Sequence, residues 1–193
     1  MLKKHSFDFV RDTASAFRLL MDCFANPGKE NRLGQYFGKF DSENPGLLLI
    51  AVILLDNEVS FEIEGDKDVA REISELTGCE RKESDKADYI FVSEPLSSRE
   101  KQTLLESCRH GSFESPNESA TIVIGCNSDE RELISLKSPC LNEMNRVSAP
   151  KEAADWLRKI RDRNFEYPQG VDMIIISETG TCFCVPRLIK AVN

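Results

Sequence analysis

A strand, a helix and a second strand follow one another between residues 87 and 125, and this order decides the fold class. The stretch ADYIFV (87–92) is a short apolar run among charged residues, which predicts a buried strand. The tetrad SSRE (97–100) matches a capping box and predicts a helix that runs to His110. The stretch SATIVIG (119–125) predicts another strand. Strand–helix–strand order is typical of an α/β protein.

Further helices and strands are predicted on both sides of this unit. Before it, the sequence predicts a helix over 12–24, a weak segment over 33–40 that suits a bent strand, a buried helix over 47–55, a strand over 59–63 and a helix over 66–77. The segment 47–55 is apolar enough for a strand, but Asn44-Pro45 before it favours a helix start. In the first helix, the residues at helical spacing on the apolar side are Phe17, Leu20, Met21 and Phe24.

After the central unit, the sequence predicts a strand over 132–137 that pairs with the strand 119–125, a helix opened by Pro150, and a hairpin of residues 171–177 and 182–185. Helices therefore alternate with strands along the chain, and two hairpins come late. We expect one α/β domain over residues 1–193, built as a mixed β-sheet flanked by helices.

Length and charge exclude several classes of protein. The 193 residues (21.8 kDa) suffice for a core, since a chain of this size buries about 70% of its surface. Lysine and arginine number 25 against 33 aspartates and glutamates, a net charge of −8 that disfavours binding to nucleic acid or anionic membranes. The longest apolar run, 47–55, is half of a membrane span, and residues 1–12 contain no secretory segment. We therefore expect a cytoplasmic location.

The cysteines favour reduced thiols over a metal site. There are seven, an odd number without any CxxC pair: Cys23, Cys79, Cys108, Cys126, Cys140, Cys182 and Cys184. Cys182 and Cys184 are two residues apart on a predicted strand, so their thiols face the same side. A structural zinc site would need distant cysteines to converge, and we expect no metal and no cofactor.

Phosphate-binding and nucleophile motifs such as GxxxxGK[ST], GxGxxG, HExxH and GxSxG are missing from the sequence. Cys108 with His110 is a possible nucleophile and base, but Gly111 follows directly and favours the end of a helix instead.

Two acidic residues are candidates for ligand contacts. Asp56 follows an apolar run and could orient a ligand, although a turn role is favoured. Asp172 is flanked by apolar residues and needs a partner, for which Arg187 and Arg18 are the candidates, either as an internal ion pair or at an anion site.

Several blocks of the sequence, in order, resemble one family. They are AFRLLM (16–21) with NPG (26–28), ILLDNEVSF (53–61), the strand 87–92, SPNESATIV (115–123), FEYPQGVDMII (165–175) and VPR (185–187). Together they are similar to the PhnH subunit of the bacterial carbon–phosphorus lyase, and the two last blocks are the most specific. SPCL (138–141) lacks the glycines that the family usually has there, which affects the expected loop geometry.

The resemblance implies a fold related to the pyridoxal-phosphate-dependent transferases, without their cofactor. It implies a complex with the PhnG, PhnI and PhnJ subunits, which forms ribose 1-methylphosphonate 5-triphosphate from ATP and methylphosphonate by displacing adenine. The family assigns catalysis chiefly to PhnI and PhnJ, so we expect a structural or assembly role. The alternatives are a self-contained enzyme using Cys108/His110 or Asp172/Arg187, and a binder that keeps a pocket without a reaction.

A subunit of a complex exposes apolar surface, so we expect the isolated chain to form a homodimer. The sequence offers Phe37, Phe40, Phe183 and Val185 as interface candidates. A strand over 182–185 is apolar on both faces, as if both were covered. The C-terminal pair is preferred, because VPR (185–187) lies where the family pattern is strongest. The alternative is that a helix of the same chain covers the second face.

Overall fold

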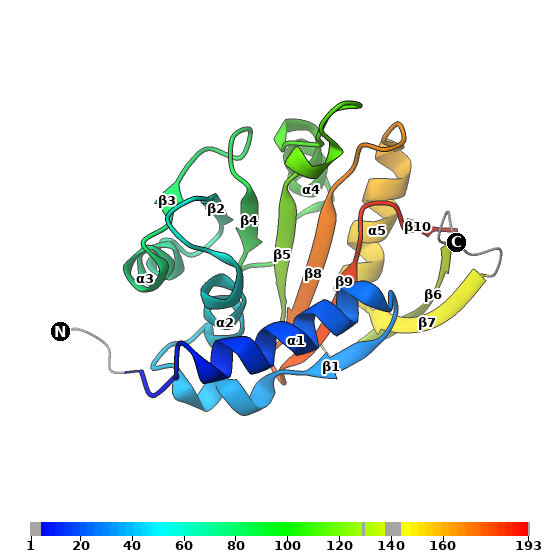
Figure 1. Ribbon diagram of the computed structural model, residues 1–193. Coiled ribbons are helices and arrows are strands. Elements are labelled where there is room, and N and C mark those ends of the chain that lie inside the picture. Colours follow the sequence, from blue (N-terminus) through cyan, green and yellow to red (C-terminus); the bar gives the residue numbers. More distant parts are fainter. Residues whose placement is uncertain (1–4, 129, 138–143, 193) are drawn as a thin grey trace.

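A mixed sheet with helices on both faces forms the centre of the molecule (Figure 1). The structure is a computed structural model that describes residues 5–128, 130–137 and 144–192. The strand order is β1 (Glu30–Arg32), β9 (Thr181–Val185), β8 (Asp172–Ser177), β5 (Thr121–Cys126), β4 (Tyr89–Val92), β2 (Ser60–Glu64) and β3 (Glu80–Arg81). The strands from β8 to β3 are parallel, and β9 and β1 are antiparallel to their neighbours. The expected α/β class with a mixed, helix-flanked sheet is confirmed.

Two apolar cores lie on the two faces of this sheet. One face packs against α1 (Arg11–Ala25), the 3₁₀-helix η1 (Gly34–Lys39), α2 (Pro45–Leu54) and α3 (Lys67–Thr77), and we call this side the front core. The other face packs against α4 (Ser98–Ser107) and α5 (Lys151–Arg163), and we call it the back core. Neighbouring strand residues alternate between them: Phe91 is in the front core, whereas Ile90 is in the back core.

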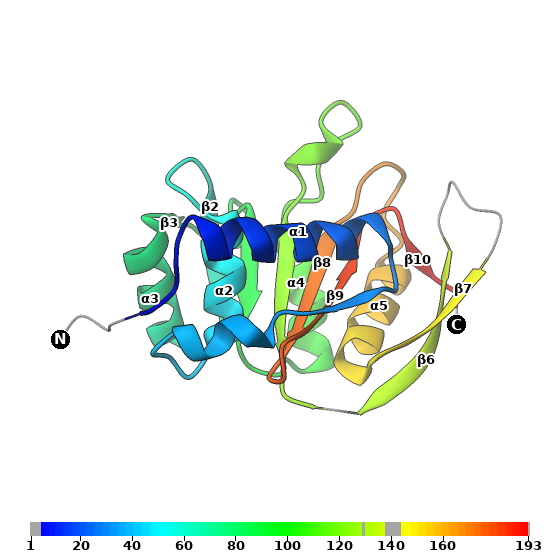
Figure 2. The same cartoon turned by 60° about the horizontal axis from the view of Figure 1, so that its bottom comes forward.

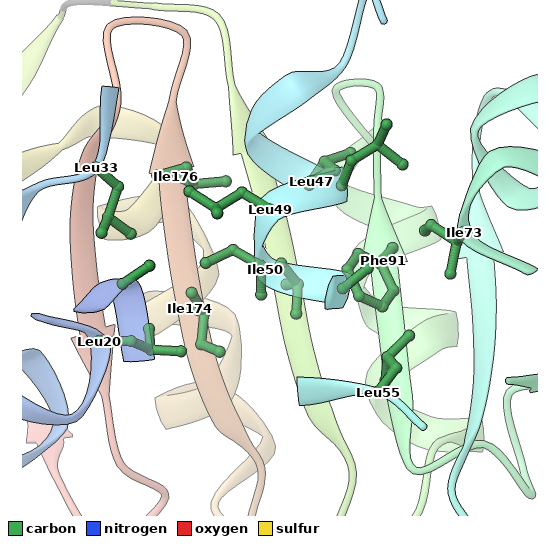
Figure 3. Close-up of a cluster of buried hydrophobic side chains, with 14 of the residues drawn as sticks. Leu20, Leu33, Leu47, Leu49, Ile50, Leu55, Ile73, Phe91, Ile174 and Ile176 are labelled. Carbon is green, nitrogen blue, oxygen red and sulfur yellow. The ribbon is translucent and has the colours of Figure 1, made fainter. Parts of the chain in front are cut away.

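Helix α2 is the centre of the front core. Its residues 46–51 are all buried, and Leu49 and Ile50 lie among side chains from α1 and β8 (Figure 3). Pro45 occupies the first turn, where a missing N–H costs nothing, so this very apolar segment starts as a helix. The interpretation of 47–55 as a helix is confirmed.

The other predicted helix boundaries have clear local causes. Ser97 and Glu100 form both hydrogen bonds of the capping box at the start of α4. Asp66 caps α3, and Gly78 ends it in the left-handed conformation. Helix α4 ends at Ser107, three residues before the predicted His110.

The weak segment 33–40 is not a bent strand, because residues 34–39 form η1. Here the chain packs against the β8–β9 turn, where the Leu33 N–H donates to the Gly180 carbonyl at 2.7 Å. A Cβ on Gly180, whose φ is +83°, would lie 2.2 Å from the Cα of Gly34. Two glycines are therefore needed where these backbones touch.

Strand β6 (Arg131–Lys137) does not pair with β5, contrary to the sequence-based expectation. It belongs to a separate three-stranded sheet with β7 (Met144–Pro150) and β10 (Lys190–Ala191), visible at the right of Figure 2. Both edges of β5 are already occupied by β4 and β8, so no edge is left for a hairpin partner. The C-terminal hairpin of β8 and β9 forms as predicted.

The block 138–141, where the sequence departs from the family pattern, lies outside the described residues. No helix in the described parts of the chain has both the length and the apolarity to cross a membrane.

Candidate functional site

A cavity of about 350 Å³ lies between α5, the loop after it and the chain that follows β9. Apolar side chains such as Leu157, Ile160 and Ile189 form much of its wall. Its charged lining residues are Lys137, Arg161, Arg187 and Lys190. No aspartate or glutamate is among the described residues that line it, although acids outnumber bases in the whole chain.

Two of the cations stand directly opposite each other. Lys190 of β10 is the register partner of Lys137 of β6, and like charges in this position repel. Arg161 and Arg187 instead have acidic partners, Asp162 and Asp172. The two lysines are therefore the groups that would gain most from a bound anion.

Arg187, which lines this cavity, forms an ion pair with Asp172, the partner considered from sequence. Nη1 of Arg187 lies 3.1 Å from Oδ2 of Asp172, and the Arg187 N–H donates to Oδ1 at 2.8 Å. Nη1 also donates to Ser119 Oγ at 3.2 Å. A Cβ on Gly170 would lie 3.1 Å from the Cβ of Arg187, so this glycine lets the loop before β8 pack tightly on the pair. Of the two alternatives from sequence, this geometry is that of the internal ion pair.

The other two ligand candidates lie elsewhere. Asp56 is exposed, and its Oδ1 accepts the N–H of Glu58 at 2.9 Å, which is the turn role. Arg18 is exposed on α1, and Asp172 takes Arg187 as its partner instead.

Cys108 and His110 do not form an activated pair. Burial raises the pKa of the Cys108 thiol to about 12, so it stays protonated at neutral pH. Nε2 of His110 is 2.7 Å from the Leu105 carbonyl, which can only accept, so this nitrogen carries the proton. Burial also lowers the pKa of His110. Among the described residues, neither histidine is hydrogen-bonded to a serine, threonine or cysteine.

A second polar pair lies at the amino end of β4. Asp88 Oδ2 accepts from the N–H and the hydroxyl of Ser60 at 2.9 and 2.6 Å, and Oδ1 is 2.5 Å from Nη1 of Arg109. Burial raises the pKa of Asp88, but the Ser60 hydrogen bonds and the Arg109 charge outweigh it and lower the pKa. This pair and Asp172–Arg187 both hold the amino ends of the parallel strands, whereas open α/β sheets bind ligands at the carboxyl ends.

A second cavity, of about 360 Å³, is at those carboxyl ends. It lies between the ends of β5 and β8 and the start of α2. Glu43 and Glu178 line it, and none of its described lining residues is a lysine or arginine. Its charge therefore disfavours an anion, in contrast to the cavity beside α5.

Three of the four sequence-predicted interface residues are buried inside the chain, and this is a correction. Phe40 is in the front core, and Phe183 and Val185 are in the back core. Phe37 is half-buried and packs against the front core. The sheet and its helices cover both faces of β9, so its apolar residues have no surface to offer a partner.

Helix α1 instead carries a row of exposed apolar side chains, whereas other exposed apolar residues such as Phe113, Leu133 and Tyr167 lie on separate segments. Val10, Ala14, Phe17 and Met21 are spaced by four, three and four residues, so they lie on one line along the helix. Phe17 and Met21 are 41% and 39% exposed, and Val10 is 77% exposed. We call these four residues the α1 stripe. The buried side of α1 consists of Ala16, Leu20 and Cys23.

Sequence reasoning missed this second stripe because it counted Phe17 and Met21 with the buried residues. The spacing of four, three and four residues that begins at Val10 was the signal in the sequence that could have indicated the α1 stripe. Helix α1 runs along the outside of the molecule in both views (Figures 1 and 2), so its outward side is open to a partner.

The fold and these sites define a class: an α/β protein with a ligand-sized cavity and an exposed apolar helix face. Comparison with known proteins gives the family. The model for "Bacterial phosphonate metabolism protein (PhnH)" matches residues 5–191, nearly the whole chain. The chain belongs to the PhnH family and therefore to bacterial phosphonate metabolism. A search of curated proteins gave no significant match.

Proposed function

We propose that the chain is an assembly subunit of the carbon–phosphorus lyase core complex, without a catalytic step of its own. In this proposal it supports the formation of ribose 1-methylphosphonate 5-triphosphate from ATP and methylphosphonate, in which the phosphonate displaces adenine. The PhnH family match over residues 5–191 is the observation that carries the proposal. The partners would be PhnG, PhnI and PhnJ.

The α1 stripe supports an assembly role. Val10, Phe17 and Met21 are large apolar side chains that are between 39% and 77% exposed, and grouped exposed apolar residues usually mark a protein interface. The outward side of α1 is therefore our candidate for the surface that a partner subunit covers. In the absence of that partner, we propose that two copies pair through the same stripe, since a two-fold dimer is the commonest closed arrangement.

The state of the candidate catalytic groups also supports a noncatalytic subunit. A thiol of pKa about 12 cannot serve as a nucleophile at neutral pH, and His110 donates its Nε2 proton to a backbone carbonyl. Asp172 and Arg187 are engaged with each other. The self-contained enzyme that uses these residues therefore has less support. A fold related to the pyridoxal-phosphate-dependent transferases remains part of our proposal.

The test is phosphonate-dependent release of adenine from ATP by purified PhnG, PhnI and PhnJ, with this chain added or omitted. We expect release to depend on the chain, and the chain alone to release no adenine and to bind no pyridoxal phosphate covalently. Release of adenine by the purified chain alone, abolished by one substitution in a cavity, would instead support the hypothesis of a self-contained enzyme.

The cavity beside α5 favours a second candidate function, a binder of an organic anion without a reaction. This function is supported by Lys137 and Lys190, which lie opposite each other and line the cavity together with apolar side chains. Calorimetric titration with ATP and with methylphosphonate tests this function. Saturable binding that is weakened by Lys190→Glu would support it, and heats equal to dilution with both compounds would exclude it.

A further inference from the structure

Three cysteines meet inside the front core, one from the first helix and two from a strand near the end of the sequence. Cys23 is on the buried side of α1, and Cys182 and Cys184 point to the same side of β9. Their sulfur atoms all lie within 4.8 Å of one another. The Sγ atoms of Cys182 and Cys184 are 3.9 Å apart, and all three side chains are fully buried. The convergence of distant cysteines that a metal site would need is therefore present for Cys23 and the Cys182/Cys184 pair.

The period of the strand and the position of α1 explain this convergence. Alternate residues of a strand face the same side, which brings Cys182 and Cys184 together. Helix α1 packs over this face of β9, and the Cys23 thiol donates a weak hydrogen bond to the Cys182 carbonyl at 3.5 Å.

We propose that Cys23, Cys182 and Cys184 form a binding site for a soft monovalent metal ion, Cu(I), in three-coordinate geometry. A metal–thiolate bond of about 2.3 Å places the three sulfurs of a planar trigonal site about 4.0 Å apart, because each edge is √3 times the bond length. The separation of 3.9 Å between Cys182 and Cys184 matches that edge. The remaining sulfur distances need to shorten by less than 1 Å from their 4.8 Å limit.

The donor set favours Cu(I) over Zn²⁺. Structural zinc sites have four protein ligands, whereas this group contains three. Among the described residues, no histidine, aspartate or glutamate joins the three cysteines within the same distance. Full burial leaves no open position for water as a fourth ligand. Soft thiolate sulfur is the ligand that Cu(I) prefers.

Binding at this site is a ligand exchange without electron transfer. Cu(I) leaves its carrier and forms bonds to the three sulfurs, each thiol that becomes a thiolate releases one proton to solvent, and copper stays Cu(I). Because the sulfurs are sealed under α1, the folded chain must open locally before it can load. We therefore expect loading to be faster during refolding than into the folded chain. The bound ion would join α1 to β9 directly beneath the helix that carries the α1 stripe.

The experiment uses the full chain under anaerobic conditions, with Cu(I) supplied as its bicinchoninate complex and Zn²⁺ as a separate arm. We expect the chain to remove one equivalent of Cu(I) from the chelator. Cys23→Ser and Cys184→Ser should each weaken this binding by at least about tenfold. Cys126→Ser is the matched control, since Cys126 is also buried but lies in the back core, and it should bind like the unmodified chain.

Copper-edge X-ray absorption of the unmodified chain is a second measurement that does not depend on variants. Three sulfurs at a single distance of about 2.3 Å would support the site. Nitrogen or oxygen ligands, or only two sulfurs, would overturn it. Loss of binding in Cys126→Ser equal to that in Cys184→Ser would overturn it too, as would stoichiometric binding of Zn²⁺ with no binding of Cu(I).

Discussion

Strand β9 and the outward side of α1 are both apolar, yet only one of them is covered by the chain itself. Cys182 and Cys184 of β9 are in the front core, and Phe183 and Val185 are in the back core. Helix α1 covers β9 with one side and leaves the stripe with Phe17 and Met21 exposed on another. The comparison teaches that an apolar run marks an interface only when the chain's own elements do not cover it.

The largest expected effect is on β9. Phe183→Glu places a charge in the back core, where the side chain is fully buried, and should lower the free energy of unfolding by more than about 4 kcal/mol. Urea unfolding followed by circular dichroism measures this loss. Phe17→Glu on the α1 stripe is the matched control, with an expected change of about 1 kcal/mol or less. A stable, folded Phe183→Glu protein would contradict the burial of β9.

Self-association should depend on the α1 stripe and not on β9, whose apolar side chains are buried. Sedimentation equilibrium at micromolar concentration should give twice the chain mass of 21.8 kDa for the unmodified protein. Phe17→Glu combined with Met21→Lys should weaken the dimer at least about tenfold without unfolding the chain, because interface energy is concentrated in a few large side chains. A mass near 21.8 kDa at every concentration of the unmodified protein would refute the dimer.

A pH experiment tests how much Asp88, at the amino end of β4, contributes to the stability of the sheet. The pKa of Asp88 is lowered in the folded state, so its contribution to stability is present above its ordinary pKa of 3.8 and is lost as the pH falls through the folded value. Asp88→Asn should cost about 1 kcal/mol at neutral pH, a figure reduced for the solvent exposure of the pair. The difference between the two proteins should stay constant from about pH 5 to 7 and shrink below about pH 4, as urea unfolding at each pH would show. A constant difference down to pH 2 would contradict this account.

The smallest expected effect concerns the reactivity of the cysteine thiols. Thiol titration under denaturing, nonreducing conditions with a chelator should find close to seven free thiols, and three or fewer would refute a reduced chain. In the folded protein most thiols should react slowly with iodoacetamide. The six described cysteines are buried, and burial raises the pKa of Cys79 to about 11 and that of Cys108 to about 12.

Local signals made much of the fold predictable. The capping box at Ser97, the Gly78 helix end and the apolar strand of residues 89–92 depend on neighbouring residues, and each is present in the structure. The pairing of β6 depends on which sheet edges are free, and that follows only from the complete topology.

The sites were less predictable, for a related reason. Asp172 needed a partner because of its apolar neighbours, and Arg187 was among the candidates. The meeting of Cys23 with Cys182 depends on how α1 packs on β9, 159 residues away in the sequence. Helical spacing alone also could not say which of the two apolar stripes of α1 faces the core.

The central claim is that the α1 stripe holds this chain in the phosphonate complex. Its most direct test is adenine release from ATP by fixed amounts of PhnG, PhnI and PhnJ, titrated with the unmodified chain, with Phe17→Glu/Met21→Lys, and with Leu133→Glu. Leu133 is the control because it is 70% exposed on β6, away from α1. The account predicts that the α1 variant reaches the same plateau only at about tenfold or higher concentration, while Leu133→Glu follows the unmodified chain. An α1 variant that titrates like the unmodified chain would contradict the claim.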